Sequence, residues 1–426
     1  MSRWGRKTLG EFVSLQRGHD LTEPDRKPGS FPVMGSAGQN GFHGVALAKG
    51  PGVVIGRSGA SFGQIHFTHE DYWPHNTCLY VTDFHDNDPR FVYYFQKSIR
   101  FEGYNSGSAQ PSLSRNFIYP IQMHVTCDPD EQRAIANVLG CFDEKIELNR
   151  RMSQTLEVIA QAIFKSWFVD FEPVRAKASG ESHESIAQRL GLAPAHLDLF
   201  PDLLVETDNG LAPEGWRLVT LKDLTTKIGS GATPRGGREV YVDEGVALIR
   251  SQNVYDSEFV WPGLARLTDE AAAQLANVTV QPSDVLLNIT GASILRTCVV
   301  PDAVLPARVN QHVAIIRARA GVSARYLHLH LLRPETKALL LGLNAGASRE
   351  AVTKAHLESV RLLNPGTALM QRFDATVGAL YAQVANNAAQ SQALGQTRDA
   401  LLPRLLSGAL SPQHMAHAAV VFEAVT

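Results

Sequence analysis

Two polar, glycine-containing segments in the first half of the chain carry side chains that suit contacts with nucleic-acid bases. In Arg57-Ser-Gly-Ala-Ser61 an arginine precedes small hydroxyl side chains and a flexible backbone. A guanidinium can donate two hydrogen bonds to the O6/N7 edge of guanine, and small residues allow close approach to phosphate. The segment from Asn105 to Arg115 adds amides that suit the N6/N7 edge of adenine. The candidates from these segments are Arg57, Ser58, Ser61, Asn105, Ser108, Gln110, Ser112 and Arg115.

The second half of the chain offers a similar set of polar segments. Arg250-Ser-Gln252-Asn253 follows a predicted strand, and Asn288-Ile-Thr290-Gly-Ala-Ser293 contains a second Gly-Ala-Ser triplet. An element common to both halves is expected to hold phosphate or turn geometry, whereas its differing neighbours are better suited to base contacts. The alternative is that these loops are only solvated turns. The candidates are Arg250, Gln252, Asn253, Asn288, Thr290, Ser293, Arg296, Ser348, Arg349 and Lys354.

The residue patterns for catalysis are weak throughout the chain. An adenine methyltransferase needs an Asn/Asp-Pro-Pro-aromatic loop, and Asn364-Pro-Gly and Asp88-Pro-Arg do not fit it. No Gly-x4-Gly-Lys-Ser/Thr phosphate loop exists, which argues against ATP hydrolysis. A degenerate nuclease-like pattern, Pro129-Asp130 with Asp143-Glu-Lys145, straddles a predicted helix start instead of adjacent strands. The sequence therefore predicts a chain without catalytic residues.

Composition is that of an ordinary globular protein, with 44% hydrophobic and 19% charged residues among 426. The net charge of −2 argues mildly against a DNA clamp that works alone, but it allows basic patches or partners that supply charge. Four cysteines without CxxC spacing and the lack of a long apolar run predict a cytoplasmic, non-membrane protein. His66, His69 and His75 lack a cysteine or carboxylate to complete a metal site, so we expect no metal there.

The chain repeats itself. Gly103-Tyr-Asn105-Ser-Gly107-Ser recurs as Gly342-Leu-Asn344-Ala-Gly346-Ala, and Trp4-x3-Thr8-Leu9 recurs as Trp216-x3-Thr220-Leu221. Each copy is followed by a helical pattern, so two similar modules are expected. The interval between the repeated motifs is longer in the second half by 27 residues (239 − 212 = 27). The modules have therefore diverged, and we expect their targets to differ.

Composition and periodicity divide the chain into alternating globular and helical regions. Strand-rich segments bounded by Gly, Pro, Asn and Asp alternate with two stretches of helical spacing that are nearly free of Gly and Pro. The clearest predicted strands are Gly52–Ile55, Cys78–Val81, Asp284–Ile289 and Val313–Ile316. The expected regions are a first α/β domain (1–128), a central helix (129–170), a linker (171–215), a second α/β domain (216–366), a C-terminal helix (367–410) and a tail (411–426).

The two helical stretches superpose at a constant offset (387 − 149 = 238) and share a heptad seam over more than four heptads. Both seams become polar at the same place, at Asn149 and Ser153 in one and at Asn387 and Ser391 in the other. Chain connectivity favours an antiparallel pair with these polar residues together, fixing the register; two unrelated core helices are the alternative. From Ile135 to Ile163 such a rod is about 42 Å long, somewhat more than one ~34 Å turn of B-DNA.

With these motifs in order, the chain resembles the specificity subunit of type I restriction–modification systems. The resemblance covers nearly the whole sequence, and the order and spacing of its motifs make it specific. Besides the two Trp-x3-Thr-Leu starts, the motifs are Gly229-Ser-Gly-Ala-Thr-Pro234, Val309-Asn-Gln-His-Val313, Glu131-Gln-Arg133-Ala-Ile135, Lys165-Ser-Trp-Phe-Val-Asp-Phe-Glu-Pro-Val-Arg-Ala-Lys177, Leu199-Phe-Pro-Asp202 and Pro213-Glu-Gly-Trp216.

The resemblance implies an α/β fold with two target recognition domains in a pseudo-two-fold arrangement, separated by an antiparallel coiled coil. It also implies that each domain reads one half of a bipartite, asymmetric site in double-stranded DNA. The helices would set the spacer and dock two methyltransferase subunits, to which motor–nuclease subunits attach. S-adenosylmethionine, ATP and magnesium would be bound by those partners, with no cofactor in this chain.

Two other functions are compatible with the sequence. The chain could serve a methylation-only or other phage-defence assembly, because that difference lies in neighbouring subunits. Alternatively, two α/β lobes could form a scaffold that binds proteins or glycans. The scaffold hypothesis predicts no DNA affinity in the presence of a methyltransferase partner.

Overall fold

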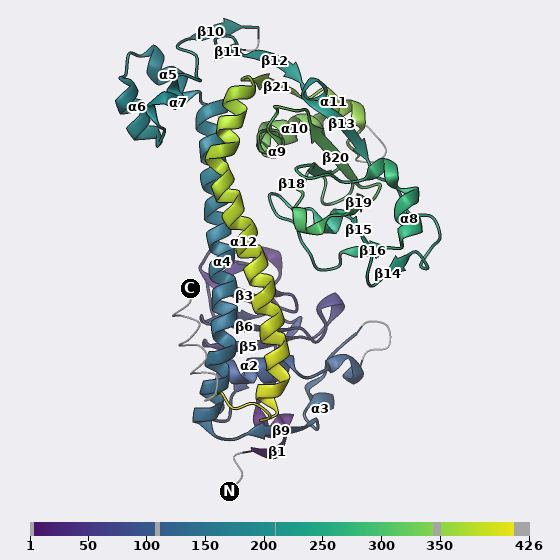
Figure 1. Ribbon diagram of the computed structural model, residues 1–426. Helices are drawn as coiled ribbons and strands as arrows, with labels where there is room; N and C mark the ends of the chain where they lie inside the picture. The colour runs from purple at the N-terminus through teal and green to yellow at the C-terminus, as the bar shows by residue number, and fades with distance from the viewer. Residues whose placement is uncertain (1–3, 107–110, 209, 344–350, 413–426) are drawn as a thin grey trace. The chain divides into compact units, whose positions relative to one another are not determined.

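The computed structural model describes residues 4–106, 111–208, 210–343 and 351–412. The chain divides into two compact units, here called unit 1 (Met1–Arg150 with Ala388–Thr426) and unit 2 (Arg151–Asn387). Each unit combines one α/β module with part of each of two 40-residue helices, α4 (Pro129–Phe168) and α12 (Thr367–Leu406) (Figure 1).

The module of unit 1 is built on an antiparallel sheet of order β2-β8-β5-β6. A second sheet has the order β4-β3-β7, and β1 pairs with β9. The strands are β1 (Trp4–Thr8), β2 (Ser14–Arg17), β3 (Phe31–Gly35), β4 (Gly38–His43), β5 (Gly52–Gly56), β6 (Ile65–Thr68), β7 (Trp73–Pro74), β8 (Cys78–Asp83) and β9 (Gln122–Thr126). The short helices are α1 (Leu9–Phe12), α2 (Pro89–Lys97) and α3 (Arg115–Ile118).

The module of unit 2 repeats this plan. Its sheets have the orders β13-β20-β17-β18 and β14-β16-β15-β19, and β12 pairs with β21. The strands are β12 (Arg217–Thr220), β13 (Thr225–Ser230), β14 (Tyr241–Val242), β15 (Val246–Ile249), β16 (Ala265–Leu267), β17 (Val285–Asn288), β18 (Thr297–Val299), β19 (Ala307–Val309), β20 (Val313–Ala318) and β21 (Arg361–Asn364). The helices are α8 (Asp269–Gln274), α9 (Ala324–Leu332), α10 (Pro334–Gly342) and α11 (Lys354–Glu358).

Several sequence predictions are confirmed by these elements. The four predicted strands correspond to β5, β8, β17 and β20, whose apolar runs are buried in their sheets. The repeated Trp-x3-Thr-Leu motif starts each module. Thr8 and Thr220 each cap a turn through a reciprocal contact with the acid three residues later. The repeat in sequence is thus a repeat in local structure.

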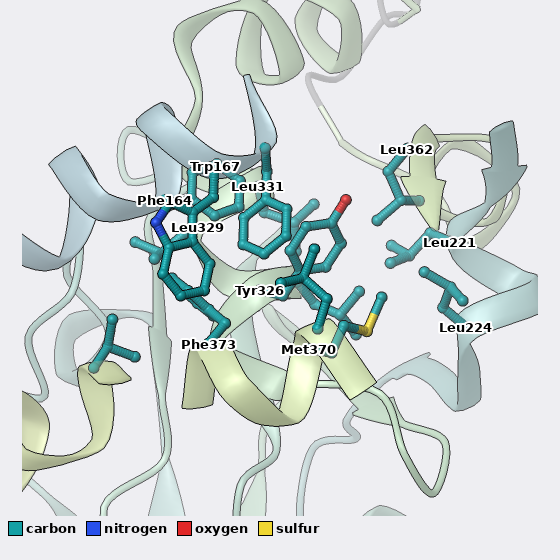
Figure 2. Close-up of a cluster of buried hydrophobic side chains, with 14 of the residues drawn as sticks. Phe164, Trp167, Leu221, Leu224, Tyr326, Leu329, Leu331, Leu362, Met370 and Phe373 are labelled. Atoms are coloured by element: carbon teal, nitrogen blue, oxygen red, sulfur yellow. The ribbon is translucent and has the colours of Figure 1, made fainter. Parts of the chain in front are cut away.

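The core of unit 2 joins its module to the long helices through aromatic rings (Figure 2). Phe164 and Trp167 on α4 lie 6.2 and 5.8 Å, between ring centroids, from Phe373 on α12. Tyr326 on α9 lies 5.6 Å from Phe164, so the module contributes to the same cluster. Burial of such large rings is the dominant favourable contribution to packing. The module is therefore fixed to its own segments of helix.

Unit 1 uses smaller side chains for the same purpose. Ile135 and Leu139 of α4 and Leu405 and Leu406 of α12 are buried in one cluster with residues of α2 and the sheet. At the 238-residue offset, Ile135 corresponds to Phe373 and Leu405 to Trp167. The interior face of the helices is conserved in position between the units, while the side chains that fill it differ.

Contacts inside each unit show that the two long helices are antiparallel. In unit 1, Asn149 Nδ2 donates to Ser391 Oγ at 3.3 Å, and Asp143 of α4 pairs with Arg398 of α12. In unit 2, Asn387 Nδ2 donates to Ser153 Oγ at 3.2 Å. From Asp143 to Asn149 the residue numbers rise along α4, whereas those of their partners on α12 fall from Arg398 to Ser391. The predicted antiparallel pairing of Asn with Ser is confirmed.

The segment expected to be a linker is instead folded. Residues 171–215 form α5 (Glu172–Ala178), α6 (His183–Leu190), α7 (Pro194–Leu197) and a hairpin of β10 (Leu204–Thr207) with β11 (Gly210–Pro213). Their apolar side chains, including Val174, Ile186 and Leu197, are buried in the core of unit 2. Two of the four prolines in this segment, Pro173 and Pro194, stand in the first turn of a helix, where the missing N–H costs little.

Candidate nucleic-acid interface

One loop has the same backbone hydrogen bonds in both modules. In unit 1 it covers residues 56–64 and in unit 2 residues 288–296, at a constant offset (291 − 59 = 232). Gly56 N donates to Gln64 O at 2.7 Å and Gly63 N donates to Gly56 O at 2.8 Å. The corresponding bonds in unit 2, from Asn288 N to Arg296 O and from Leu295 N to Asn288 O, measure 2.8 and 2.7 Å.

The repeated loop turns at the Gly-Ala-Ser triplet. Gly59 and Gly291 have φ of +78° and +75°, values that a residue without Cβ adopts at little cost. The N–H of the last residue of each loop also makes a matching bond, since Gln64 N donates to Ser61 O and Arg296 N donates to Ser293 O. The expectation that the two triplets correspond is confirmed. Their backbone is a common frame that presents different side chains.

In unit 1 the residues around this loop surround a hollow of about 780 Å³. Arg57 Nη1 donates to Asn76 O at 3.4 Å, and Arg115 Nη1 donates to Leu15 O at 3.1 Å. Each guanidinium keeps further N–H groups beyond the one used in that bond. The lining residues are Gln16, Arg17, Gly18, His19, Asp20, Arg57, Leu79, Ser106, Ser112, Leu113, Ser114 and Arg115.

Unit 2 has a smaller hollow of about 440 Å³ beside the same loop. The Arg296 guanidinium lies over the Tyr255 ring, 4.3 Å from its centroid, and Thr290 Oγ1 lies 2.6 Å from His312 Nδ1. Stacking on an aromatic face holds the plane of a guanidinium in place. The lining residues are Ser251, Gln252, Tyr255, Thr290, Gly291, Ala292, Ser293, Arg296 and His312.

Three predicted asparagines have amides that bond to the protein's own backbone. Asn253 is fully buried, accepts from Arg250 N at 3.0 Å and donates to Val260 O at 2.9 Å. Asn288, also fully buried, donates to Ser251 O at 2.9 Å. Asn105 accepts from Ser112 N at 2.9 Å. Their geometry is that of loop supports, and the two buried side chains are not on the surface that a duplex could reach.

The other candidates divide between the hollows and their surroundings. Ser58 pairs with Ser112 through a backbone bridge, and Thr290 pairs with Ala351 in the same way, so the repeat extends to this contact. Arg250 Nη2 and Gln252 Nε2 both donate to Gly263 O, at 2.5 and 3.1 Å. Ser61 lies in the turn Gly59–Ser61 and is half-buried.

Lys354 begins α11 as Arg115 begins α3, so these two candidates occupy corresponding positions in the two modules. Lys354 Nζ lies 3.6 Å from Glu358 Oε1. Ser108, Gln110, Ser348 and Arg349 lie outside the described residues, as do parts of the repeated Gly-x-Asn-x-Gly motif.

Sequence reasoning overlooked several residues at the hollows. Arg17 and His19 line the first, and Tyr255 and His312 line the second. Gln64, at the end of the repeated loop, is exposed. The polar segment Arg17-Gly-His19-Asp could have drawn attention to Arg17 and His19. Only the fold shows that Tyr255 stacks on Arg296 and that Gln64 ends the repeated loop.

Two further properties bear on chemistry. Among the described residues, no three His, Cys, Asp or Glu side chains gather as they would around a metal ion. His66 bonds to Ser36 O at 3.0 Å, and burial lowers the pKa of this histidine. No helix in the described part of the chain is long and apolar enough to cross a bilayer.

The structure thus defines a protein with two α/β modules that present different polar side chains on one repeated loop. Residues 1–158 match the family described as the type I restriction modification DNA specificity domain. The chain is 27% identical over 331 residues to the type I restriction enzyme HindI specificity subunit of Haemophilus influenzae, covering 70% of this chain and 71% of that protein. It is 25% identical over 338 residues to the MjaIX specificity subunit of Methanocaldococcus jannaschii, covering 76% and 70%.

A similar fold occurs in the crystal structure of a type I restriction–modification S subunit from M. genitalium. The TM-score is 0.53 at 14% identity, with 95% of this chain and 96% of that chain covered. At that identity the likeness concerns the fold alone. The sequence matches and this likeness of fold agree with the resemblance that the sequence motifs carry.

Proposed function

We propose that this chain is a non-catalytic specificity subunit in which each α/β module reads one half of a bipartite, asymmetric DNA site. The observation that carries the proposal is the repeated loop. Its backbone hydrogen bonds are the same in both modules, whereas its side chains and hollows differ. A common frame with different donors suits two readers of different sequences, because phosphate contacts position a protein and base contacts specify the site.

The polar groups at both hollows support recognition of duplex DNA. Unit 1 brings Arg17, Arg57 and Arg115 to one hollow, and unit 2 brings Gln252 and Arg296 to the other. Arginine and glutamine can each make two hydrogen bonds to a purine edge in the major groove. The chain as a whole carries a net charge of −2, so we expect its partners to supply part of the phosphate attraction.

We further propose that α4 and α12 set the spacer between the half-sites and dock two methyltransferase subunits. The Asn–Ser hydrogen bonds between the helices support a defined register, since a buried amide is costly unless it meets its partner. Methylation with S-adenosylmethionine, and ATP- and magnesium-dependent cleavage by motor–nuclease subunits, would belong to the partners. This chain would need no cofactor.

Methylome sequencing tests the proposal. Cells that carry this chain with the methyltransferase of its system should methylate a bipartite motif, and cells that lack the chain should not. Exchange of residues 1–128 for those of a relative should change one half of the motif and leave the other intact. A change of both halves would contradict the modular assignment, and the absence of any motif despite a stable complex would contradict DNA specificity itself.

The spacer assignment has its own test. Insertion of one heptad at equivalent places in both α4 and α12 keeps the helical seam in phase and lengthens the pair by roughly 10 Å. The number of unspecified bases between the methylated half-sites should then increase while both half-sites stay the same. An unaltered spacer in a folded complex would show that the helices do not set it.

A further inference from the structure

We propose that one position of the repeated loop, occupied by Gln64 in unit 1 and by Arg296 in unit 2, reads a purine in each half-site. The arginine would select guanine and the glutamine would select adenine. This inference rests on the proposed function, because it assigns a specificity-determining residue to each of the two readers.

The backbone at this position is the same in both modules. Gln64 N donates to Ser61 O at 3.1 Å, and Arg296 N donates to Ser293 O at 3.2 Å. The carbonyl oxygens of the two residues accept from Gly56 N and Asn288 N at 2.7 and 2.8 Å. Both residues stand directly before a strand, β6 or β18. The side chain therefore leaves a frame that is fixed on both sides, which is the condition for reading a base without a large ordering cost.

The Arg296 guanidinium is oriented by the Tyr255 ring for a bidentate contact with a base. Its guanidinium lies 4.3 Å from the centroid of the Tyr255 ring, and both residues line the hollow of unit 2. Among the charged side chains that the structure describes, none forms an ion pair with Arg296, so its N–H groups are not committed to a carboxylate. Gln252 and Thr290 line the same hollow and supply neighbouring polar groups.

Gln64 offers the matching amide in unit 1. The side chain is exposed, and within the described ranges no hydrogen bond occupies its amide. A glutamine can donate to N7 and accept from N6 of adenine, whereas an arginine donates to both O6 and N7 of guanine. The difference between Gln64 and Arg296 at this position of the frame is therefore also a difference in base preference.

A phosphate contact would behave differently from a base contact. Loss of a phosphate contact weakens binding to all sequences and reduces the salt dependence. Loss of a bidentate base contact changes which base is accepted at one position. A lysine can replace arginine at a phosphate but cannot reproduce the planar two-donor geometry. Substitutions that exchange arginine, glutamine and lysine therefore distinguish a base contact from a phosphate contact.

The test uses the full complex of this chain with its methyltransferase subunits, with the variants R296Q, Q64R and R296K. The control is R217Q, which changes an exposed arginine on β12 outside the hollow. The motif is determined by methylome sequencing and by selection of bound duplexes from a random library. Thermal melting establishes that each complex is folded.

We expect R296Q to replace a guanine by adenine at one position of one half-site, and Q64R to make the opposite change in the other half-site. The preference at the changed position should move by roughly 10–100-fold. R296K should relax that position, and R217Q should leave the motif unchanged. The inference is overturned if folded R296Q and Q64R complexes keep the wild-type motif, or weaken all sequences equally. If the wild-type complex itself yields no bipartite motif, the proposed function fails instead.

Discussion

The four-stranded sheets β2-β8-β5-β6 of unit 1 and β13-β20-β17-β18 of unit 2 have the same strand order but different interior side chains. The two units differ, for example, at the start of β5 and of its counterpart β17. In unit 1 this place holds Gly52, and a Cβ there would lie 2.2 Å from the ring of the buried Tyr72. In unit 2 it holds Asp284, which is fully buried and accepts two hydrogen bonds of 2.8 Å from Arg317. At corresponding positions, a glycine beside a buried ring in unit 1 thus gives way to a buried aspartate in an ion pair in unit 2.

The two units share their backbone framework and differ in the side chains that complete it. The backbone hydrogen bonds of the sheet and the loop are common to both units, while the groups that complete the interior have been exchanged in matched sets. The members of each set depend on one another, because the glycine makes room for the ring and the arginine pairs with the aspartate. A change of one member alone should therefore be costly in either unit.

The largest effect is expected for Asp284→Ala. Removal of the carboxylate leaves the partly buried Arg317 without its partner, and breaking a buried pair costs about 3–5 kcal/mol. The free energy of unfolding, measured with urea, should fall by about that amount for the transition of unit 2. Glu270→Ala, an exposed acid in the same module, should change it by less than ~0.5 kcal/mol. Equal effects of the two variants would contradict the ion pair as a structural requirement.

A smaller loss is expected for Gly52→Ala in unit 1. The added methyl group meets Tyr72, which has no exposed surface to move into, and overpacking of this kind costs about 1–3 kcal/mol. In a double-mutant cycle, Tyr72→Leu should remove most of the penalty that Gly52→Ala adds. Additive losses would show that the ring does not account for the glycine.

The sequence predicted the parts of this comparison that depend on local periodicity. Helical spacing placed α4 and α12, and the constant offset between their heptads placed Asn149 against Ser391. These predictions succeed because a heptad seam defines both the helix and the face on which it packs. The prediction of a linker at residues 171–215 was wrong because the short helices of this segment bury apolar side chains in the core of unit 2, and local composition does not reveal that packing.

Individual site residues were harder to predict for a physical reason. Residue type cannot distinguish an amide that faces solvent from one that bonds to its own loop, so Asn253 and Asn288 were selected with Arg296. The position of Gln64 becomes meaningful only when the two loops are compared bond by bond. That comparison needs backbone geometry, which neighbouring residues in the sequence do not reveal.

The substitution Arg57→Ala tests whether the repeated loop reads bases differently in the two units. Arg57 lines the hollow of unit 1, whereas the corresponding position in unit 2 is Ile289. If Arg57 contacts a guanine, its removal should weaken or relax recognition of one half-site by about 1–3 kcal/mol, seen as a lost preference in duplex selection. Ile289→Ala, the equivalent truncation, should leave the motif unchanged. Unchanged selectivity of the Arg57→Ala complex would remove this residue from the reading surface.

The smallest effect is expected from the different charge partners of acidic side chains on the long helices. In unit 1 Asp143 is paired with Arg398 and accepts from Tyr94 Oη at 2.6 Å. At the 238-residue offset, the corresponding positions in unit 2 are Tyr381 and Ala160, so the arginine is missing there. The nearby Glu157 forms no ion pair within the described residues of unit 2. Burial, assisted by the charge of Glu258, raises the pKa of Glu157 to about 7.

The raised pKa of Glu157 predicts that the stability of unit 2 depends on pH. Because folded unit 2 binds the proton of Glu157 more tightly than the unfolded chain does, its stability should fall as pH rises from the ordinary carboxyl range through about 7. Glu157→Gln should remove that loss and raise the melting temperature at pH 8 by roughly 1–3 °C, a small shift because solvent screens this partly exposed group. At pH 5 the variant and the wild type should melt together. A gain of the same size at both pH values would mean that the substitution improves packing and that protonation of Glu157 has no part in it.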